Sequence, residues 1–89
     1  MHVIVIYRPN SEYARQVEDY IVDFGRFHPG QEIEAVNIDS IEGAKKAELY
    51  RVMQYPAILA LKDDGQVQQQ WEGIDKLPLM NDLAYFARQ

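Results

Sequence analysis

The sequence predicts an α/β fold with the element order β-α-β-α-β-β-α and a four-stranded mixed sheet. Two observations lead to this prediction. First, two strand-like runs flank a segment whose apolar residues recur at helical spacing, which is typical of a parallel pair joined by a right-handed crossover. Second, an Asp-Gly pair separates two further strand-like runs, which is typical of an antiparallel hairpin. The helices must then cover the two faces of the sheet.

The composition limits what the chain can do. Its 89 residues suit one domain, residues 1–89, that is long enough to bury a core without a disulfide or metal. The absence of cysteine excludes disulfides and thiolate metal sites, and the two histidines are too separated for a zinc site. A net charge of −5 argues against a nucleic-acid partner. Because no apolar run approaches about 18 residues, we expect a cytoplasmic protein with no membrane partner.

The first strand and helix are predicted from the N-terminal third. Val3–Tyr7 is apolar on both faces, as expected for a strand in the middle of a sheet. A helix follows, with Asn10 or Ser11 as its N-cap and Glu12 in its first turn, and His28-Pro29-Gly30 ends it. The apolar residues predicted to form its buried face are Tyr13, Val17, Tyr20, Ile21, Phe24 and Phe27.

The second strand and helix come next. Glu32–Ile38 is predicted to be a strand with a kink, because its alternation through Ile33 and Ala35 shifts at Val36. Ser40 is predicted to cap a helix from Ile41 to about Arg51. The residues predicted to face inward are Ile41, Ala44, Ala47 and either Tyr50 or Val52.

The last three elements follow Tyr55-Pro56. Ala57–Leu61 is predicted to be a fully apolar strand, and Asp64-Gly65 turns the chain into the return strand Val67–Trp71. Gly73 ends that strand, and a last helix is predicted from about Asp75 to Ala87. The residues that this helix is predicted to present to the core are Leu77, Met80, Leu83, Ala84 and Phe86.

The second half of the chain resembles that of the thioredoxins. The likeness rests on Val36–Asp39, on the run from Ala47 to Ala57 that contains Tyr50, Val52 and Pro56, on Lys62–Gly65 and on Trp71–Gly73. These segments match the family pattern N-I-D, then A-x-x-Y-x-V-x-x-x-P-T, an apolar strand, K-x-G and a final glycine. The match covers about 40 residues in one register.

The first half looks more like glutaredoxin, in which a short strand leads directly into P-G-C-P-Y-C and a helix. That likeness rests on Pro9, Tyr13 and the direct passage from strand to helix. Together the two resemblances cover nearly the whole chain and imply the minimal thioredoxin fold.

The chain departs from both families at the redox site. In the family register, Ser11 and Ala14 stand where the two reactive cysteines would be. Thiol–disulfide exchange requires a thiolate that attacks sulfur, which neither a hydroxyl nor a methyl group can replace. We therefore expect no enzyme of the dithiol oxidoreductase type, no catalytic residues and no cofactor.

The resemblance also implies a binding edge. It implies that Pro56 is the family's cis-proline, and that the backbone N–H and C=O of Tyr55 can pair with an extended peptide or with glutathione by strand addition. Beside them, the start of the first helix at Ser11, Glu12 and Tyr13 offers N–H groups suited to a carboxylate. Arg8 would offset the charge of Glu12. Gly73, which matches the final glycine of the family pattern, is the last of the candidate residues for binding a peptide or another ligand.

Structural roles are equally open for these residues. Pro56 can hold a turn without binding anything, Ser11 can be a helix cap, Tyr13 can belong to the core, and Trp71 can serve packing alone. The first functional hypothesis is a redox-inactive domain that binds an unknown protein or extended peptide, or regulates one. The second is a binder of glutathione or another small thiol. The third is a scaffold domain similar to the clock-protein branch of thioredoxin-like domains, which Pro9-Asn10-Ser11 resembles.

Overall fold

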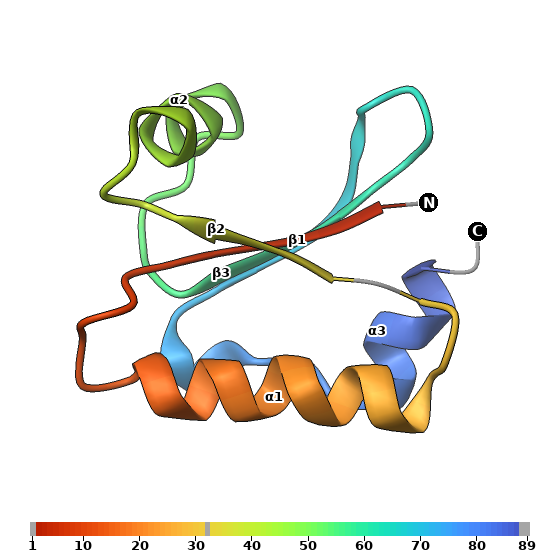
Figure 1. Ribbon diagram of the computed structural model, residues 1–89. Helices are drawn as coiled ribbons and strands as arrows, with labels where there is room; N and C mark the ends of the chain where they lie inside the picture. Colours follow the sequence, from red (N-terminus) through yellow and green to blue (C-terminus); the bar gives the residue numbers. More distant parts are fainter. Residues whose placement is uncertain (1, 32, 88–89) are drawn as a thin grey trace.

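The computed structural model describes residues 2–31 and 33–87, which form a central sheet with helices on both faces (Figure 1). The predicted element order and the mixed four-stranded sheet are confirmed. The strands lie in the order β2-β1-β3-β4. The element bounds are β1 His2–Tyr7, α1 Ala14–Phe27, β2 Ile33–Asn37, α2 Ile41–Leu49, β3 Ala57–Leu61, β4 Val67–Glu72, the 3-10 turn η1 Ile74–Lys76 and α3 Met80–Ala87.

The strand pairing follows the predicted topology. β1 runs parallel to β2 and antiparallel to β3, and β3 pairs antiparallel with β4. The register of β1 and β2 is continuous from the Val3–Ile33 pair to the Tyr7–Asn37 pair, so the predicted kink in the second strand is wrong. Its apolar residues simply point to both faces, because Ile33 and Val36 pack into different cores. Glu32, the predicted start of this strand, lies outside the described residues.

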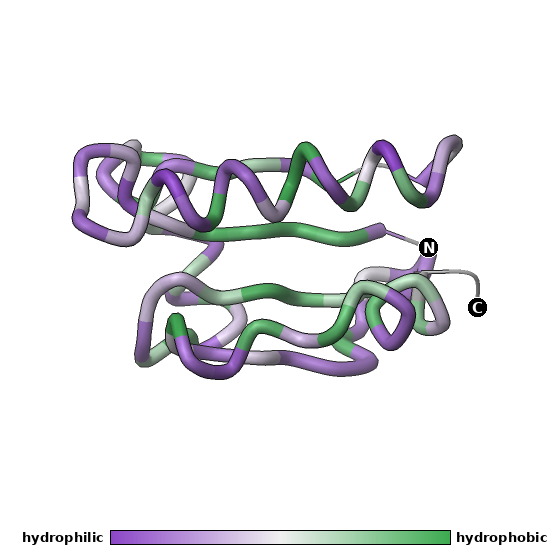
Figure 2. Tube along the Cα trace, turned by 90° about the horizontal axis from the view of Figure 1, so that it is seen from below, coloured by the Kyte–Doolittle hydropathy of each residue, from purple (hydrophilic) through white to green (hydrophobic). Residues whose placement is uncertain are grey.

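Two cores fill the two faces of the sheet. Because strand side chains alternate, Val3 and Val5 point to the layer of α1 and α3, whereas Ile4 and Ile6 point to the layer of α2. In Figure 2 the strand that starts at the N-terminus is almost entirely apolar, while α1 alternates between apolar and polar residues. β1 and β3 are therefore the buried centre of the fold, as Val3–Tyr7 and Ala57–Leu61 predicted.

The start of α1 differs from the prediction. The helix begins at Ala14, and its N-cap is Tyr13, whose side chain makes no capping bond. Neither Asn10 nor Ser11 is the cap, because residues 11–13 form turns before the helix, and Glu12 lies outside its first turn. Phe27, predicted to be core, is 65% exposed at the last residue of the helix.

Helix α2 is shorter than predicted and turned differently. It ends at Leu49, and Gly43 and Ala47 are its buried residues. Ile41, predicted to face inward, is 78% exposed, and Ala44 is exposed as well. The reason is a close approach: a Cβ at Gly43 would overlap the carbonyl oxygen of Asn37, so the glycine face lies against the chain that leaves β2. The predicted cap is confirmed, because the N–H of Gly43 donates to Ser40 Oγ over 2.9 Å.

The C-terminal helix is split. A 3-10 turn over Ile74–Lys76 comes first, and α3 begins only at Met80, so the predicted helix from Asp75 is wrong at its start. Pro78 explains the gap, since proline lacks an N–H and disfavours a helical residue before it. Leu83 and Ala84 are buried as predicted, and Trp71 packs against Phe86 with ring centroids 5.7 Å apart. No helix in the described part of the chain is long and apolar enough to span a membrane.

Candidate functional site

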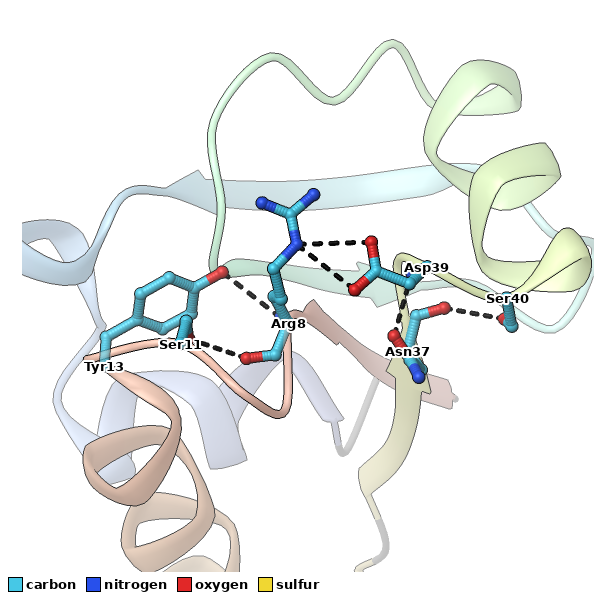
Figure 3. Close-up of polar contacts among 6 residues, drawn as sticks. All are labelled: Arg8, Ser11, Tyr13, Asn37, Asp39 and Ser40. Atoms are coloured by element: carbon cyan, nitrogen blue, oxygen red, sulfur yellow. Dashed lines mark hydrogen bonds and ion pairs between the residues drawn. The ribbon is translucent and has the colours of Figure 1, made fainter.

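The turn between β1 and α1, loop 8–13, is held by short-range hydrogen bonds (Figure 3). The Ser11 hydroxyl donates to the carbonyl oxygen of Arg8 over 2.6 Å, and the Ser11 N–H donates to the same oxygen over 3.2 Å. In return, the Arg8 N–H donates to the hydroxyl of Tyr13 over 3.2 Å. These bonds join Arg8, Ser11 and Tyr13 in one closed turn. The hydroxyl of Ser11 therefore shapes the loop, whereas the sequence suggested a helix cap.

Arg8 also reaches the chain that leaves β2. Its Nε lies 3.2 Å and 3.3 Å from the two carboxylate oxygens of Asp39, and the Asp39 N–H donates to the side-chain oxygen of Asn37 over 2.8 Å. The terminal nitrogens of Arg8 point away from Asp39 in Figure 3 and have no hydrogen-bond partner within residues 2–31 and 33–87. Because both side chains are about half exposed (52% and 56%), this pair orients the guanidinium more than it stabilises the fold.

The other predicted site residues, Tyr55, Pro56 and Gly73, lie in or beside loop 50–56. The N–H of Gly73 donates to the carbonyl oxygen of Pro56 over 2.9 Å, which joins these two predicted residues directly. The Tyr55–Pro56 peptide bond is cis, as the family resemblance implied. Gly73 has φ near +100°, a conformation that side chains disfavour, and it is buried between Gln54 and Asp75. Among the described residues, no hydrogen bond or ion pair joins this group to loop 8–13.

The backbone N–H groups of loop 50–56 are bonded inside the molecule from Tyr50 to Gln54. Three successive N–H groups, those of Tyr50, Arg51 and Val52, donate to carbonyl oxygens of α2. The next two, those of Met53 and Gln54, donate to Oε1 of Glu72 over 2.7 Å and 2.9 Å. Neither the N–H nor the C=O of Tyr55 has a partner in the part of the chain that the structure describes. The series of internal bonds thus stops at the residue that the sequence predicted to bind a strand.

A groove lies between α2 and this loop, with a volume of about 570 Å³. Its lining residues are Ile38, Ala44, Ala47, Glu48, Arg51, Val52, Met53 and Tyr55. Most of this lining is apolar, and Met53 is 82% exposed on it. Of the predicted site residues, only Tyr55 lines the groove. The other lining residues were not predicted, because an exposed methionine and small helical residues form no site pattern in the sequence until α2 is placed beside loop 50–56.

Glu72, which hydrogen-bonds to Met53 beside the groove, has a shifted pKa. Burial raises the pKa of its carboxyl and is the largest single influence. The bonds from the Met53 and Gln54 N–H groups and from the Gln70 amide nevertheless hold the pKa below its ordinary value. The predicted Glu12 is simply exposed on the surface. In residues 2–31 and 33–87, no three acidic or histidine side chains are placed to hold a metal ion.

Comparison with known proteins identifies the fold. No family model matches the sequence, and no curated protein matches it either. Solved structures do match: thioredoxin 1 from the thermophilic eubacterium Thermosipho africanus superposes with a TM-score of 0.69 at 11% identity, covering 99% of this chain and 92% of that one. A structure described as a malarial protein matches with a TM-score of 0.67 at 15% identity, covering 97% and 91%. The chain has a minimal thioredoxin fold.

Within this thioredoxin fold, Ser11 and Ala14 occupy the turn and the first residue of α1. Ala14 is buried, and the Ser11 hydroxyl is bonded to Arg8. Since the chain contains no cysteine, none of its own residues can carry out thiol–disulfide exchange. At identities of 11% and 15%, the likeness extends to the fold alone.

Proposed function

We propose that this thioredoxin-fold protein is a non-enzymatic module that binds an extended peptide or protein segment at Tyr55. The observation that carries this proposal is that, among the described residues, the Tyr55 N–H and C=O have no partner, whereas the five preceding N–H groups of the loop are all bonded internally. An extended segment would supply the missing donor and acceptor by strand addition. The binding mode needs no thiol.

The groove supports the same proposal. Strand side chains alternate, so a segment paired with Tyr55 directs every second side chain to the same side. The apolar lining beside Tyr55 suits one such side chain, and the exposed thioether of Met53 adapts to different shapes. The net charge of −5 favours a neutral or basic partner.

An NMR titration tests the proposal. The probe is a terminally blocked nine-residue peptide of alternating valine and threonine, with a lysine at each end to complement the acidic chain. A matched peptide carries an N-methyl group at its central residue and therefore lacks one N–H donor. We expect amide shifts at Tyr55, Ala57 and Met53 with the first peptide and at least tenfold weaker binding of the second. Equal binding of both peptides, or no shift at Tyr55 at millimolar concentration, would contradict strand addition there.

A second candidate function is the binding of glutathione or another small carboxylate-bearing thiol. One observation favours it: Asp39 holds Arg8 through Nε, which leaves the two terminal nitrogens of the guanidinium to bind a carboxylate in a fork. Calorimetry with S-methylglutathione tests this function, with Arg8→Gln as the variant. Binding by the wild-type protein that Arg8→Gln weakens tenfold or more supports a small-ligand site. No heat at millimolar concentration removes this candidate and leaves the peptide proposal standing.

A further inference from the structure

Glu72 stands at the end of edge strand β4 and makes an unusual set of contacts. Its Oε1 accepts hydrogen bonds from two successive backbone N–H groups, those of Met53 and Gln54, which lie 19 and 18 residues earlier in the chain. Its Oε2 accepts a third bond, over 2.6 Å, from the amide of Gln70 on the same strand. One carboxylate thus ties loop 50–56 to the edge of the sheet.

The position of these bonds matters for the groove. Met53 lines the groove, and Gln54 directly precedes Tyr55, so the two bonded N–H groups lie beside the candidate pairing residue. Arg51, the second residue of the loop, has φ near +54°, an uncommon conformation for a residue with a side chain. After Arg51 and before Pro56, Met53 and Gln54 are anchored by the bonds from their N–H groups to the Glu72 carboxylate.

We infer that Glu72 is a positioning residue for the groove: its carboxylate holds the Met53–Gln54 segment in the shape that presents the Tyr55 backbone to a bound strand. This inference rests on the proposed function for its last step only. The physical basis is that a charged acceptor binds N–H donors about twice as strongly as a neutral one. No hydrophobic contact is needed, since Met53 and Gln54 are both exposed. Without the carboxylate, two adjacent N–H groups would have water as their only partner.

Protonation of Glu72 is a natural probe of this arrangement. A protonated carboxyl loses its charge and part of its acceptor capacity, so the bonds to Met53 and Gln54 weaken. Three groups hydrogen-bond to the carboxylate: the two N–H groups on the loop and the neutral amide of Gln70 on β4. No charged side chain is among the causes of its lowered pKa. The amide proton shifts of Met53 and Gln54 are therefore expected to change with pH only as Glu72 gains its proton.

The first experiment measures the loop without any ligand. In wild-type protein, the amide proton shifts of Met53 and Gln54 are followed by NMR from neutral to acid pH, together with the side-chain carboxyl carbon of Glu72. We expect one shared midpoint, below the ordinary range of a glutamate. Loop amides that titrate apart from Glu72, or that do not move while Glu72 titrates, would overturn the inference.

The second experiment uses variants in the full chain. Glu72→Ala removes the acceptor, and Glu72→Gln keeps one neutral oxygen, so we expect hydrogen exchange at the Met53 and Gln54 amides to rise at least tenfold in the first and less in the second. Glu34→Gln is the matched control, because Glu34 is also a half-buried carboxylate on an edge strand, bonded instead to Lys46 and His2. Unchanged exchange in Glu72→Ala, or an equal rise in Glu34→Gln, would overturn the inference.

Peptide affinity then tests the link to function. With the alternating valine and threonine peptide described above, we expect binding about tenfold weaker in Glu72→Ala than in Glu34→Gln, with Glu72→Gln between them. Equal affinity in Glu72→Ala and the wild type would show that the carboxylate does not position the groove. If the wild-type protein binds no peptide, the proposed function fails, while the exchange and titration results still decide whether Glu72 holds the loop.

Discussion

The two loops of the candidate site are held in different ways. Loop 8–13 is closed by bonds among Arg8, Ser11 and Tyr13, which are at most five residues apart. Loop 50–56 is bonded locally to α2 as far as Val52, but Met53 and Gln54 depend on Glu72, which is 19 and 18 residues away, and Pro56 accepts a bond from Gly73. The first loop is thus a local structure, whereas the second half of loop 50–56 is held by an edge strand formed later in the chain and by the residue that follows it. A substitution in β4 should disturb the second loop and leave the first unchanged.

The largest expected effect comes from the contact that places α2, the helix from which loop 50–56 emerges. In Gly43→Ala, the new methyl group would overlap the carbonyl oxygen of Asn37 and lie 3.0 Å from Ser40 Oγ. Because the crowded atoms are mostly backbone, we expect a loss of about 3 kcal/mol in the free energy of unfolding, measured in urea.

The matched control is Gly25→Ala, a helical glycine in α1 with no atom within 4 Å of the added methyl group. Alanine favours the helix, so this variant should gain about 0.5–1 kcal/mol. Similar effects of the two substitutions would mean that α2 does not lie as closely against Asn37 as the structure has it.

The next effect concerns the pH dependence of stability through Glu72. Its pKa is lower in the folded protein than in an unfolded chain, so its contribution is present at neutral pH and is lost as the pH falls through the folded pKa. Glu72→Gln should therefore cost roughly 1 kcal/mol at neutral pH and little at an acid pH below the folded pKa of Glu72. Urea unfolding of both proteins at the two pH values measures this. A difference that stays constant with pH would contradict the role of the carboxylate charge.

A difference of about 0.5 kcal/mol is expected between Ser11 and Ser40, both of which the sequence predicts to be helix caps. Ser40 caps α2 by accepting the N–H of Gly43, so Ser40→Ala should cost about 1 kcal/mol. The Ser11 hydroxyl makes one bond among the described residues, to the Arg8 carbonyl, and water can take its place there, so Ser11→Ala should cost about 0.5 kcal/mol. Thermal or urea unfolding decides the order, and a larger cost at Ser11 would mean that it caps a helix after all.

The smallest effect is expected at the ion pair between Arg8 and Asp39. Asp39→Asn removes the partner of Arg8, but both side chains are about half exposed, so stability should change by less than about 0.5 kcal/mol. The informative measurement is binding of S-methylglutathione, which should weaken if an oriented Arg8 holds a carboxylate. A loss of more than about 1 kcal/mol in unfolding free energy would show that the pair is structural.

Much of the fold followed from the sequence, because its determinants are local. Val3–Tyr7 and Ala57–Leu61 are continuous apolar runs, and such runs can only be the centre of a sheet covered on both faces. The Asp64-Gly65 turn and the Ser40 cap are likewise set by neighbouring residues, and both are present. The cis bond before Pro56 came from the family resemblance and is also present.

Local pattern failed in two helices, for different reasons. The rotation of α2 depends on the Asn37 carbonyl against Gly43, which puts Ile41 in solvent despite its hydrophobicity. The start of α3 was misplaced because the helical spacing of apolar residues was followed through Pro78, which the backbone cannot accommodate within a helix.

The candidate site likewise has residues that the sequence indicated and residues that only the structure revealed. The sequence by itself determined that the chain has no cysteine. Together with the family resemblance, it indicated the candidate site residues Arg8, Ser11, Glu12, Tyr13, Tyr55, Pro56 and Gly73. Only the tertiary structure brought Glu72 to the N–H groups of Met53 and Gln54 and placed α2 so that a groove opens beside Tyr55. The physical reason is the distance along the chain between interacting residues. Turns, caps and buried strands are fixed by neighbours in sequence, whereas a carboxylate 18 residues away becomes a partner only after the sheet has formed.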